Sequence, residues 1–249
     1  MNSDEDYNFS DLRAVFINCS LKRSKSESHT QLLIDKAARI MDVQGVTVEQ
    51  VYARDRDIAA GMIKDGKEVG DADDWPEIQR QILAADILVI GTPIWLGVKS
   101  SVATRVIERM YAYSGDRNAK GQYLYYGKTG GCVVTGNEDG IKHCAMDILY
   151  ALQHIGFTVP PQADCGWIGE AGPGPSYGDT EWNGKPTSAT QIPLGFDNDF
   201  TNRNATFMSW NLMHTARSLK DRGGIPAHGN TAEGWEHVTN ARSDNPEYK

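Results

Sequence analysis

The feature that most constrains this chain is a segment near its middle, residues 87–90, in which every side chain is apolar. A strand with one solvated face alternates apolar and polar residues, whereas a strand without polar interruptions is buried on both faces. Strands of that kind occur in parallel sheets whose faces are covered by helices. We therefore predict an α/β fold in which residues 87–90 belong to a parallel sheet.

Strand-like and helix-like segments alternate along the rest of the chain. Strand character is found at residues 14–20, 46–53, 129–135 and 157–168, the last interrupted by Pro160 and Pro161. Apolar residues recur at helical spacing in residues 31–43, 75–85, 100–113, 139–155 and 199–219. This alternation is typical of right-handed strand–helix–strand units, in which the strands are parallel.

The charged segment 54–74 is predicted to be a loop with one short helical turn at about residues 58–63. Asp74 is expected to be the N-cap of the helix that follows, because Pro76 lies in the first turn and Glu77 at the third position.

Five parallel strands with this spacing fit the order 2-1-3-4-5, which is that of the flavodoxin-like three-layer fold with helices on both faces of the sheet. We predict one domain over residues 1–249. Its parts are a core at about 11–167, a helix at 199–219, an insertion at 169–198 and a C-terminal arm at 223–249. The insertion is rich in Gly, Pro, Ser, Thr and aromatic residues, and long loops of this kind are usually functional.

Composition and charge exclude several classes of function for this chain. The chain has 249 residues and a formal net charge of −8, which argues against binding to nucleic acid or to an anionic membrane. No apolar run approaches the roughly 20 residues of a membrane helix, and the polar N-terminus lacks the regions of a signal peptide, so a cytoplasmic location is expected. The four cysteines form no CxxC pair, so we expect buried reduced thiols and no metal or iron–sulfur centre.

In a sheet of this order, ligands bind beyond the carboxyl ends of the strands, at the loops after the first, third and fourth strands. The loop after the first strand holds five hydroxyl residues and three cations within eleven positions and leads directly into a helix. Hydroxyls and amides at a helix N-terminus favour a phosphate ligand. The alternative is that Ser28 or Thr30 merely caps the helix. The candidate phosphate ligands are Ser20, Lys22, Ser26, Ser28, His29 and Thr30, with Arg23 as a further source of charge.

The other two loops are suited to a flat ring. Trp95 stands where an aromatic side chain can pack beside a planar ligand, although a lone tryptophan can instead be a core residue. Glycines allow the backbone to approach such a ligand closely, and Asn137 can hydrogen-bond its polar edge. For Asp139, a role as helix N-cap is the leading interpretation. The candidate ring-binding residues are Pro93, Ile94, Trp95, Leu96, Gly97, Thr135, Gly136, Asn137, Glu138 and Gly140.

Three sequence segments carry a family resemblance: INCSLKRSKSESHTQLL, VIGTPIWLGVKSSVATRVIERM and VVTGNEDG. In this order after these strands, they resemble the NADPH-dependent FMN reductases and iron–sulfur-flavoprotein-like branch of the flavodoxin superfamily, over about residues 13–167. The resemblance implies non-covalent FMN, held at the phosphate by the first loop and at the ring by the other two. This sequence departs from the family pattern in two ways: its first loop is longer, and it has His29 where the family often has asparagine.

The function expected from these observations is an NAD(P)H-dependent flavin oxidoreductase. Hydride would pass from the nicotinamide to FMN and then to a small acceptor such as a quinone, a free flavin or a nitro compound. The cofactor carries the redox chemistry, so no acid–base residue is named. Trp95, Tyr177 or Trp182 are expected to line an open face of the ring. The resemblance also implies a homodimer or homotetramer. Two alternatives stay open: a flavodoxin-type electron carrier, and a binder of another phosphate ligand.

Overall fold

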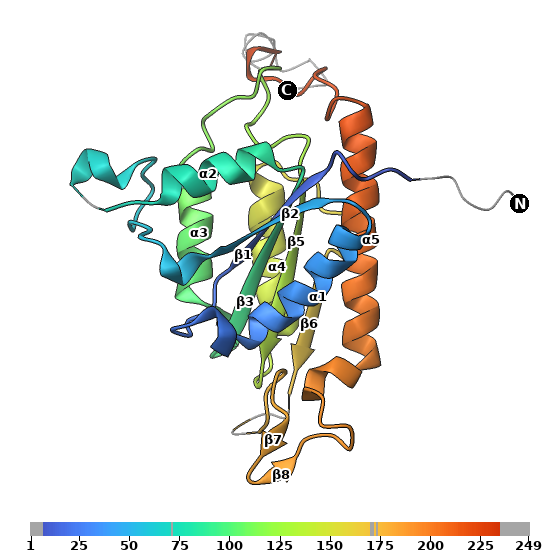
Figure 1. The fold of residues 1–249 in the computed structure, drawn as a ribbon. Helices are drawn as coiled ribbons and strands as arrows, with labels where there is room; N and C mark the ends of the chain where they lie inside the picture. The colour runs from blue at the N-terminus through green and yellow to red at the C-terminus, as the bar shows by residue number, and fades with distance from the viewer. Residues whose placement is uncertain (1–6, 71, 170–171, 173, 235–249) are drawn as a thin grey trace, which may run out of the picture.

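The computed structural model describes residues 7–70, 72–169, 172 and 174–234. Its centre is a parallel sheet in the order β2-β1-β3-β5-β6, which confirms the predicted order of the five strands (Figure 1). The strands are β1 (Arg13–Asn18), β2 (Thr47–Tyr52), β3 (Ile87–Trp95), β5 (Thr129–Gly136) and β6 (Asp164–Ile168). The apolar residues 87–90 are all buried, because β3 lies between β1 and β5 and helices pack on both faces of the sheet.

Helices cover both faces of the sheet, as predicted (Figure 1). On one face lie α1 (His29–Val43) and α5 (Asp199–Asp221); on the other lie α2 (Trp75–Ala84), α3 (Ser101–Tyr111) and α4 (Ile141–Ile155). The pleat of the strands divides the apolar side chains between the two layers, so Phe16 packs toward α1 and α5 while its neighbour Ile17 packs toward α2, α3 and α4.

Three short strands were not predicted. β4 (Val98–Lys99) pairs antiparallel with the end of β3, and β7 (Glu181–Trp182) and β8 (Lys185–Pro186) form a hairpin within the insertion. Each is two residues long, so none repeats an alternating pattern that a sequence could reveal. The hairpin lies beyond the carboxyl end of β6, at the lower end of the molecule in Figure 1.

Two predicted boundaries were wrong. Residues 157–159 are not part of β6, because only Thr158 bridges to the sheet, at Thr129. Asp139 does not cap α4, whose N-cap is Gly140 with a φ of 134°. Asp74 does occupy the N-cap position of α2, but its carboxylate accepts a hydrogen bond from the amide of Asp57, 3.0 Å away, and makes no capping bond.

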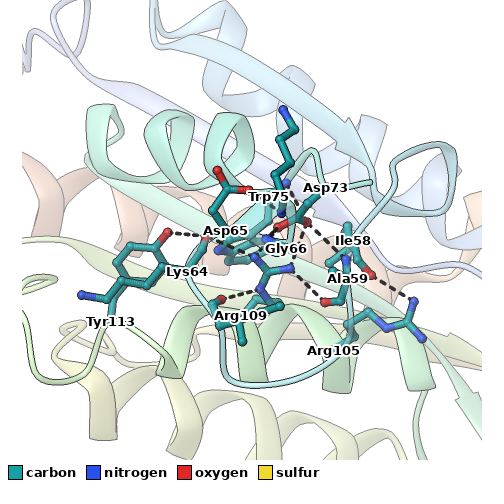
Figure 2. A network of polar contacts seen from close by, with 12 residues as sticks. Ile58, Ala59, Lys64, Asp65, Gly66, Asp73, Trp75, Arg105, Arg109 and Tyr113 are labelled. Atoms are coloured by element: carbon teal, nitrogen blue, oxygen red, sulfur yellow. Dashed lines mark hydrogen bonds and ion pairs between the residues drawn. The ribbon is translucent and has the colours of Figure 1, made fainter. Parts of the chain in front are cut away.

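The expected helical turn at residues 58–63 is also wrong. The 3₁₀ turns of this region lie at η2 (Ala53–Asp55) and η3 (Gly66–Val69). Between them, backbone carbonyls accept hydrogen bonds from side chains of α3 instead of from a helix of their own (Figure 2). Arg105 binds the carbonyl of Ile58, while Arg109 reaches the carbonyls of Ala59, Ile63 and Lys64.

All four cysteines are free and buried, as predicted. Within the described part of the chain, no helix is long and apolar enough to cross a membrane. Most of the expected C-terminal arm, residues 235–249, lies outside the described residues.

Candidate functional site

A pocket of about 590 Å³ opens at the carboxyl ends of the strands. The loops after β1, β3 and β5 and the insertion after β6 all contribute to it, as expected for the switch point of this sheet order. Its lining residues are Ser20, Leu21, Lys22, His29, Thr30, Pro93, Ile94, Trp95, Thr135, Gly136, Asn137, Glu138, Trp167, Gly172, Ser176 and Tyr177.

The loop after β1 is shaped by a buried asparagine at the end of that strand. The Asn18 side chain accepts a hydrogen bond from the amide of Ser20, and donates to the hydroxyl of Ser28 and to the side chain of Gln31. The Ser28 hydroxyl in turn caps α1 by accepting from the amide of Gln31. Ser28 is therefore a buried N-cap, which was the alternative interpretation of this residue.

Four polar residues of this loop and helix line the pocket near the start of α1, namely Ser20, Lys22, His29 and Thr30. The hydroxyl of Ser20 accepts a hydrogen bond from the amide of Lys22 at 3.2 Å, and Lys22 adds a positive charge to the same wall. Thr30 is buried in the first turn, where its hydroxyl lies 2.7 Å from that of Thr135. This contact joins the first loop to the end of β5. The combination of a helix N-terminus, hydroxyls and a lysine is suited to an anion.

The loop after β3 is a tight hairpin into β4. Trp95 is half exposed at the pocket, so the alternative of a core tryptophan was wrong. Leu96 and Gly97 form the tip with φ values of 50° and 79°, and Leu96 is 89% exposed. Positive φ at both central residues is the geometry of a type I′ turn, in which leucine is unusual. Neither tip residue lines the pocket.

The loop after β5 brings Gly136, Asn137 and Glu138 to the pocket. The Asn137 side chain is engaged within the protein: its amide group donates to the carbonyls of Gly174 and Pro175 at 2.8 and 3.0 Å, and its oxygen accepts from the Ser176 hydroxyl at 3.2 Å. The Asn137 side chain thus lines the pocket while it is hydrogen-bonded to the insertion.

The insertion forms the remaining wall. Tyr177 is fully buried between Trp167 and Phe196, with ring centroids 5.7 and 5.6 Å away, and its hydroxyl has no hydrogen-bond partner among the described residues. Burial raises the pKa of this phenol well above its usual range, so it stays protonated. Tyr177 lines the pocket as expected, whereas Trp182 lies in β7 and does not.

Eleven of the sixteen predicted residues come together along this pocket. The five that do not are Ser26, Ser28, Leu96, Gly97 and Gly140. Ser26 is exposed in a 3₁₀ turn, η1 (Lys25–Glu27), where its hydroxyl contacts that of Ser24. Gly140 packs against the hairpin instead, since a Cβ there would lie 2.7 Å from the carbonyl oxygen of Gly97.

Sequence reasoning missed four lining residues, Leu21, Trp167, Gly172 and Ser176. Trp167 gave a usable signal, because it is an aromatic residue near the carboxyl end of a strand. Gly172 and Ser176 gave none, since the insertion has no periodic pattern.

The residues present fit a flavin phosphate. The start of α1 with Ser20, Thr30 and Lys22 offers donors to a phosphate, whereas Pro93, Ile94, Trp95 and Trp167 offer an apolar surface to a ring system. The volume lies in the ordinary range for small-molecule and cofactor pockets, roughly 300–1,000 Å³. Among the described residues, no group of three or more His, Cys, Asp and Glu side chains could hold a metal ion.

Fold and site together define a flavodoxin-like protein with a pocket of flavin size. Comparison with known proteins agrees: the sequence pattern of the NADPH-dependent FMN reductases matches residues 12–167. The chain belongs to this family of flavin-binding oxidoreductases.

Two curated relatives are similar over most of this chain. The 8-demethyl-8-aminoriboflavin-5′-phosphate synthase of Streptomyces davaonensis is 36% identical over 217 residues, which are 84% of this chain and 79% of that enzyme. A protein of Mycobacterium bovis named divalent metal cation transporter MntH is 57% identical over 213 residues. That match covers 85% of this chain but only 30% of the relative, so this chain corresponds to less than a third of that protein.

A solved structure shows the same architecture. RosB, crystallised with bound 8-demethyl-8-formylriboflavin-5′-phosphate, superposes with a TM-score of 0.78 and 32% sequence identity, covering 94% of this chain and 88% of that one. The similarity therefore extends beyond residues 12–167 and takes in more than the core that the family pattern matches.

Proposed function

We propose that this protein is an FMN-binding, NAD(P)H-dependent oxidoreductase that passes hydride or electrons through bound FMN to a small acceptor such as a quinone or a second flavin. The observation that carries the proposal is the pocket at the switch point of the sheet, which has anion donors at its α1 end and an aromatic surface beside them. Membership of the FMN reductase family supports it.

In this proposal the residues divide into two sets. Ser20, Lys22, Thr30 and the first-turn amides of α1 hold the phosphate, because they combine hydroxyl donors, a cation and the positive end of a helix dipole. The ring system is held by the loop after β3, at Pro93, Ile94 and Trp95, and by the loop after β5, at Thr135, Gly136, Asn137 and Glu138.

When FMN is bound, it supplies the redox chemistry, namely acceptance and release of a hydride. The protein's own part is positioning. The hydroxyl contact between Thr30 and Thr135 sets the distance between the phosphate end and the ring end of the site. Trp95 and Trp167 present apolar side chains that shield the ring from water, and the half-exposed position of Trp95 leaves room for a second planar molecule.

The visible absorption spectrum of the purified protein tests the proposal. We expect a yellow protein whose released pigment is FMN, and bleaching of the bound flavin by NADPH or NADH under anaerobic conditions in a stopped-flow instrument. A colourless protein that takes up no FMN on titration would refute the flavin site. A yellow protein that neither nucleotide bleaches would refute the reductase and favour the flavodoxin-type carrier.

A second candidate function follows from the relatives. In it, the flavin phosphate is a substrate that is chemically altered and released, because the similarity to the Streptomyces davaonensis synthase and to RosB covers 84% and 94% of this chain, more than the core that the family pattern matches. Chromatography and mass spectrometry of the flavin after incubation with enzyme separate the two. An unchanged FMN mass after many turnovers supports the reductase, whereas a new flavin mass supports conversion.

The proposal also includes a homodimer or homotetramer. The exposed apolar side chains of Met146 and Tyr150, four residues apart on α4, are suited to burial between subunits. Light scattering on the purified protein measures the mass directly, and a monomer of 27.5 kDa would contradict this part.

A further inference from the structure

The segment 174–179 of the insertion crosses the pocket wall from the third loop to the first, and we call it the wall segment. One end is held by Asn137, through its bonds to Gly174, Pro175 and Ser176. The other end is held by His29, whose Nδ1 accepts a hydrogen bond of 2.6 Å from the amide of Gly178. Asn137 belongs to the loop after β5, and His29 is the first residue of α1. The two anchors therefore join the wall segment to two different parts of the sheet edge.

The wall segment fits closely at Tyr177 and Gly178. A Cβ on Gly178 would lie 2.4 Å from Leu32 Cδ1 and 3.0 Å from His29 Nδ1, so a larger residue there would have to displace the Leu32 side chain. A Cβ on Gly195 would lie 1.8 Å from the ring of Tyr177. The segment is thus seated in a specific position, and its buried Tyr177 forms part of the pocket.

The hydrogen bond at His29 imposes a protonation state. Only an unprotonated Nδ1 accepts from an amide, so the imidazole is neutral and carries its proton on Nε2. Two charged groups face the ring: Asp179 of the wall segment, with Oδ1 3.7 Å from Nε2, and Lys22 of the first loop. Burial lowers the pKa of His29; Asp179 acts in the opposite direction and Lys22 in the same direction. The neutral form is therefore the one present at pH 7.

We propose that His29 is a positioning residue, which in its neutral form holds the wall segment against the pocket, and which releases the 176–179 turn when it is protonated. The binding part of this inference rests on the proposed flavin site, whereas the structural part does not. The pocket is consequently complete at neutral pH, and in acid its wall loses one of the two anchors that join it to α1 and to the loop after β5.

Three variants distinguish the loss of a hydrogen-bond acceptor at position 29 from the protonation of the His29 imidazole. His29→Asn places an amide oxygen on Cγ, where Nδ1 was, so it keeps an acceptor that does not titrate. His29→Phe keeps a ring but removes the acceptor. His154→Asn is the matched control, because it removes an exposed histidine at the far end of α4.

Hydrogen exchange at the Gly178 amide, measured without flavin at pH 7.5 and at pH 5, is the first readout. Its rate is expressed relative to His29→Asn at the same pH, which cancels the intrinsic pH dependence of exchange. We expect the wild type and His154→Asn to match that variant at pH 7.5 and to exchange roughly 3- to 10-fold faster at pH 5, the size of one hydrogen bond. His29→Phe is expected to exchange faster at both values. A wild-type ratio that does not change with pH, or full protection in His29→Phe, would overturn the proposal.

Riboflavin affinity over the same range is the second readout, since riboflavin lacks the phosphate, whose own ionisation near pH 6 would obscure the profile. The wild type should lose affinity toward pH 5 by a similar factor, and His29→Asn should be flat. Identical profiles for the two would overturn the positioning role even if the exchange result holds. If no flavin binds at any pH, the proposed function fails, while hydrogen exchange still decides whether His29 holds the wall segment.

Discussion

Replacement of Arg109 by methionine should destabilise the protein strongly. Both Arg109 and its partner Asp73 have fully buried side chains, and their closest contact is 2.6 Å (Figure 2). The guanidinium makes two hydrogen bonds to the Asp73 carboxylate and three to backbone carbonyls of residues 59–64. Methionine fills similar space but leaves a buried carboxylate without its cation and three carbonyls without their donor.

The expected cost follows from that geometry. Breaking a buried ion pair by removing one partner costs about 3–5 kcal/mol. For a chain of this size, each kcal/mol corresponds to roughly 2–4 °C in melting temperature, so the variant should melt about 6–20 °C lower. Arg105→Met is the matched control: Arg105 lies one turn earlier on α3, is exposed, and donates one bond of 3.2 Å to the carbonyl of Ile58. Its cost should stay below about 1 kcal/mol.

Urea unfolding followed by far-ultraviolet circular dichroism measures both variants against the wild type. Equal slopes of unfolding free energy against urea concentration would show that all three proteins expose the same surface on unfolding. The urea midpoints then report their relative stability. If Arg109→Met loses no more stability than Arg105→Met, then the buried pair does not hold residues 58–66 onto α3, and the reasoning from Figure 2 is refuted.

Three further results are expected. The pKa of Asp73 is about 2, because hydrogen bonds from Arg109 and three backbone amides outweigh the burial that would raise it. Its ionised form therefore contributes about 2 kcal/mol to the free energy of unfolding above pH 4, and this contribution is lost as pH falls toward 2. Urea unfolding at several pH values should show that Asp73→Asn loses less stability in acid than the wild type. The same decrease of unfolding free energy with pH in both proteins would contradict this. Leu96→Asn should raise stability by about 0.5–1 kcal/mol, since asparagine tolerates the positive φ of this exposed turn, and a lower unfolding midpoint would count against a strained leucine. Ser20→Ala should weaken FMN binding roughly 3- to 10-fold but leave riboflavin unaffected; equal losses, measured by fluorescence titration, would place Ser20 away from the phosphate.

The uneven success of sequence reasoning at the site has a clear pattern. The loops after β1, β3 and β5 were located correctly because a parallel sheet of known order brings the carboxyl ends of its strands to one edge. The roles of single side chains within those loops were harder to predict from the sequence. Ser28 makes a local capping bond to the amide of Gln31, which the sequence did not distinguish from a phosphate contact. Asn137 binds the insertion, a partner 37 residues away that the local sequence does not specify.

Local pattern alone determined the layers of this protein: the apolar β3 strand, the helical stripes that cover it, and the hydroxyl-rich turn into α1 are properties of short stretches of chain. The wall of the pocket was decided only by the tertiary structure. His29 meets Gly178 across 149 positions of sequence, and Tyr177 reaches the pocket from a segment without periodicity. Contacts of that kind depend on which surfaces the packed sheet and helices bring together, and no short window of residues contains that information.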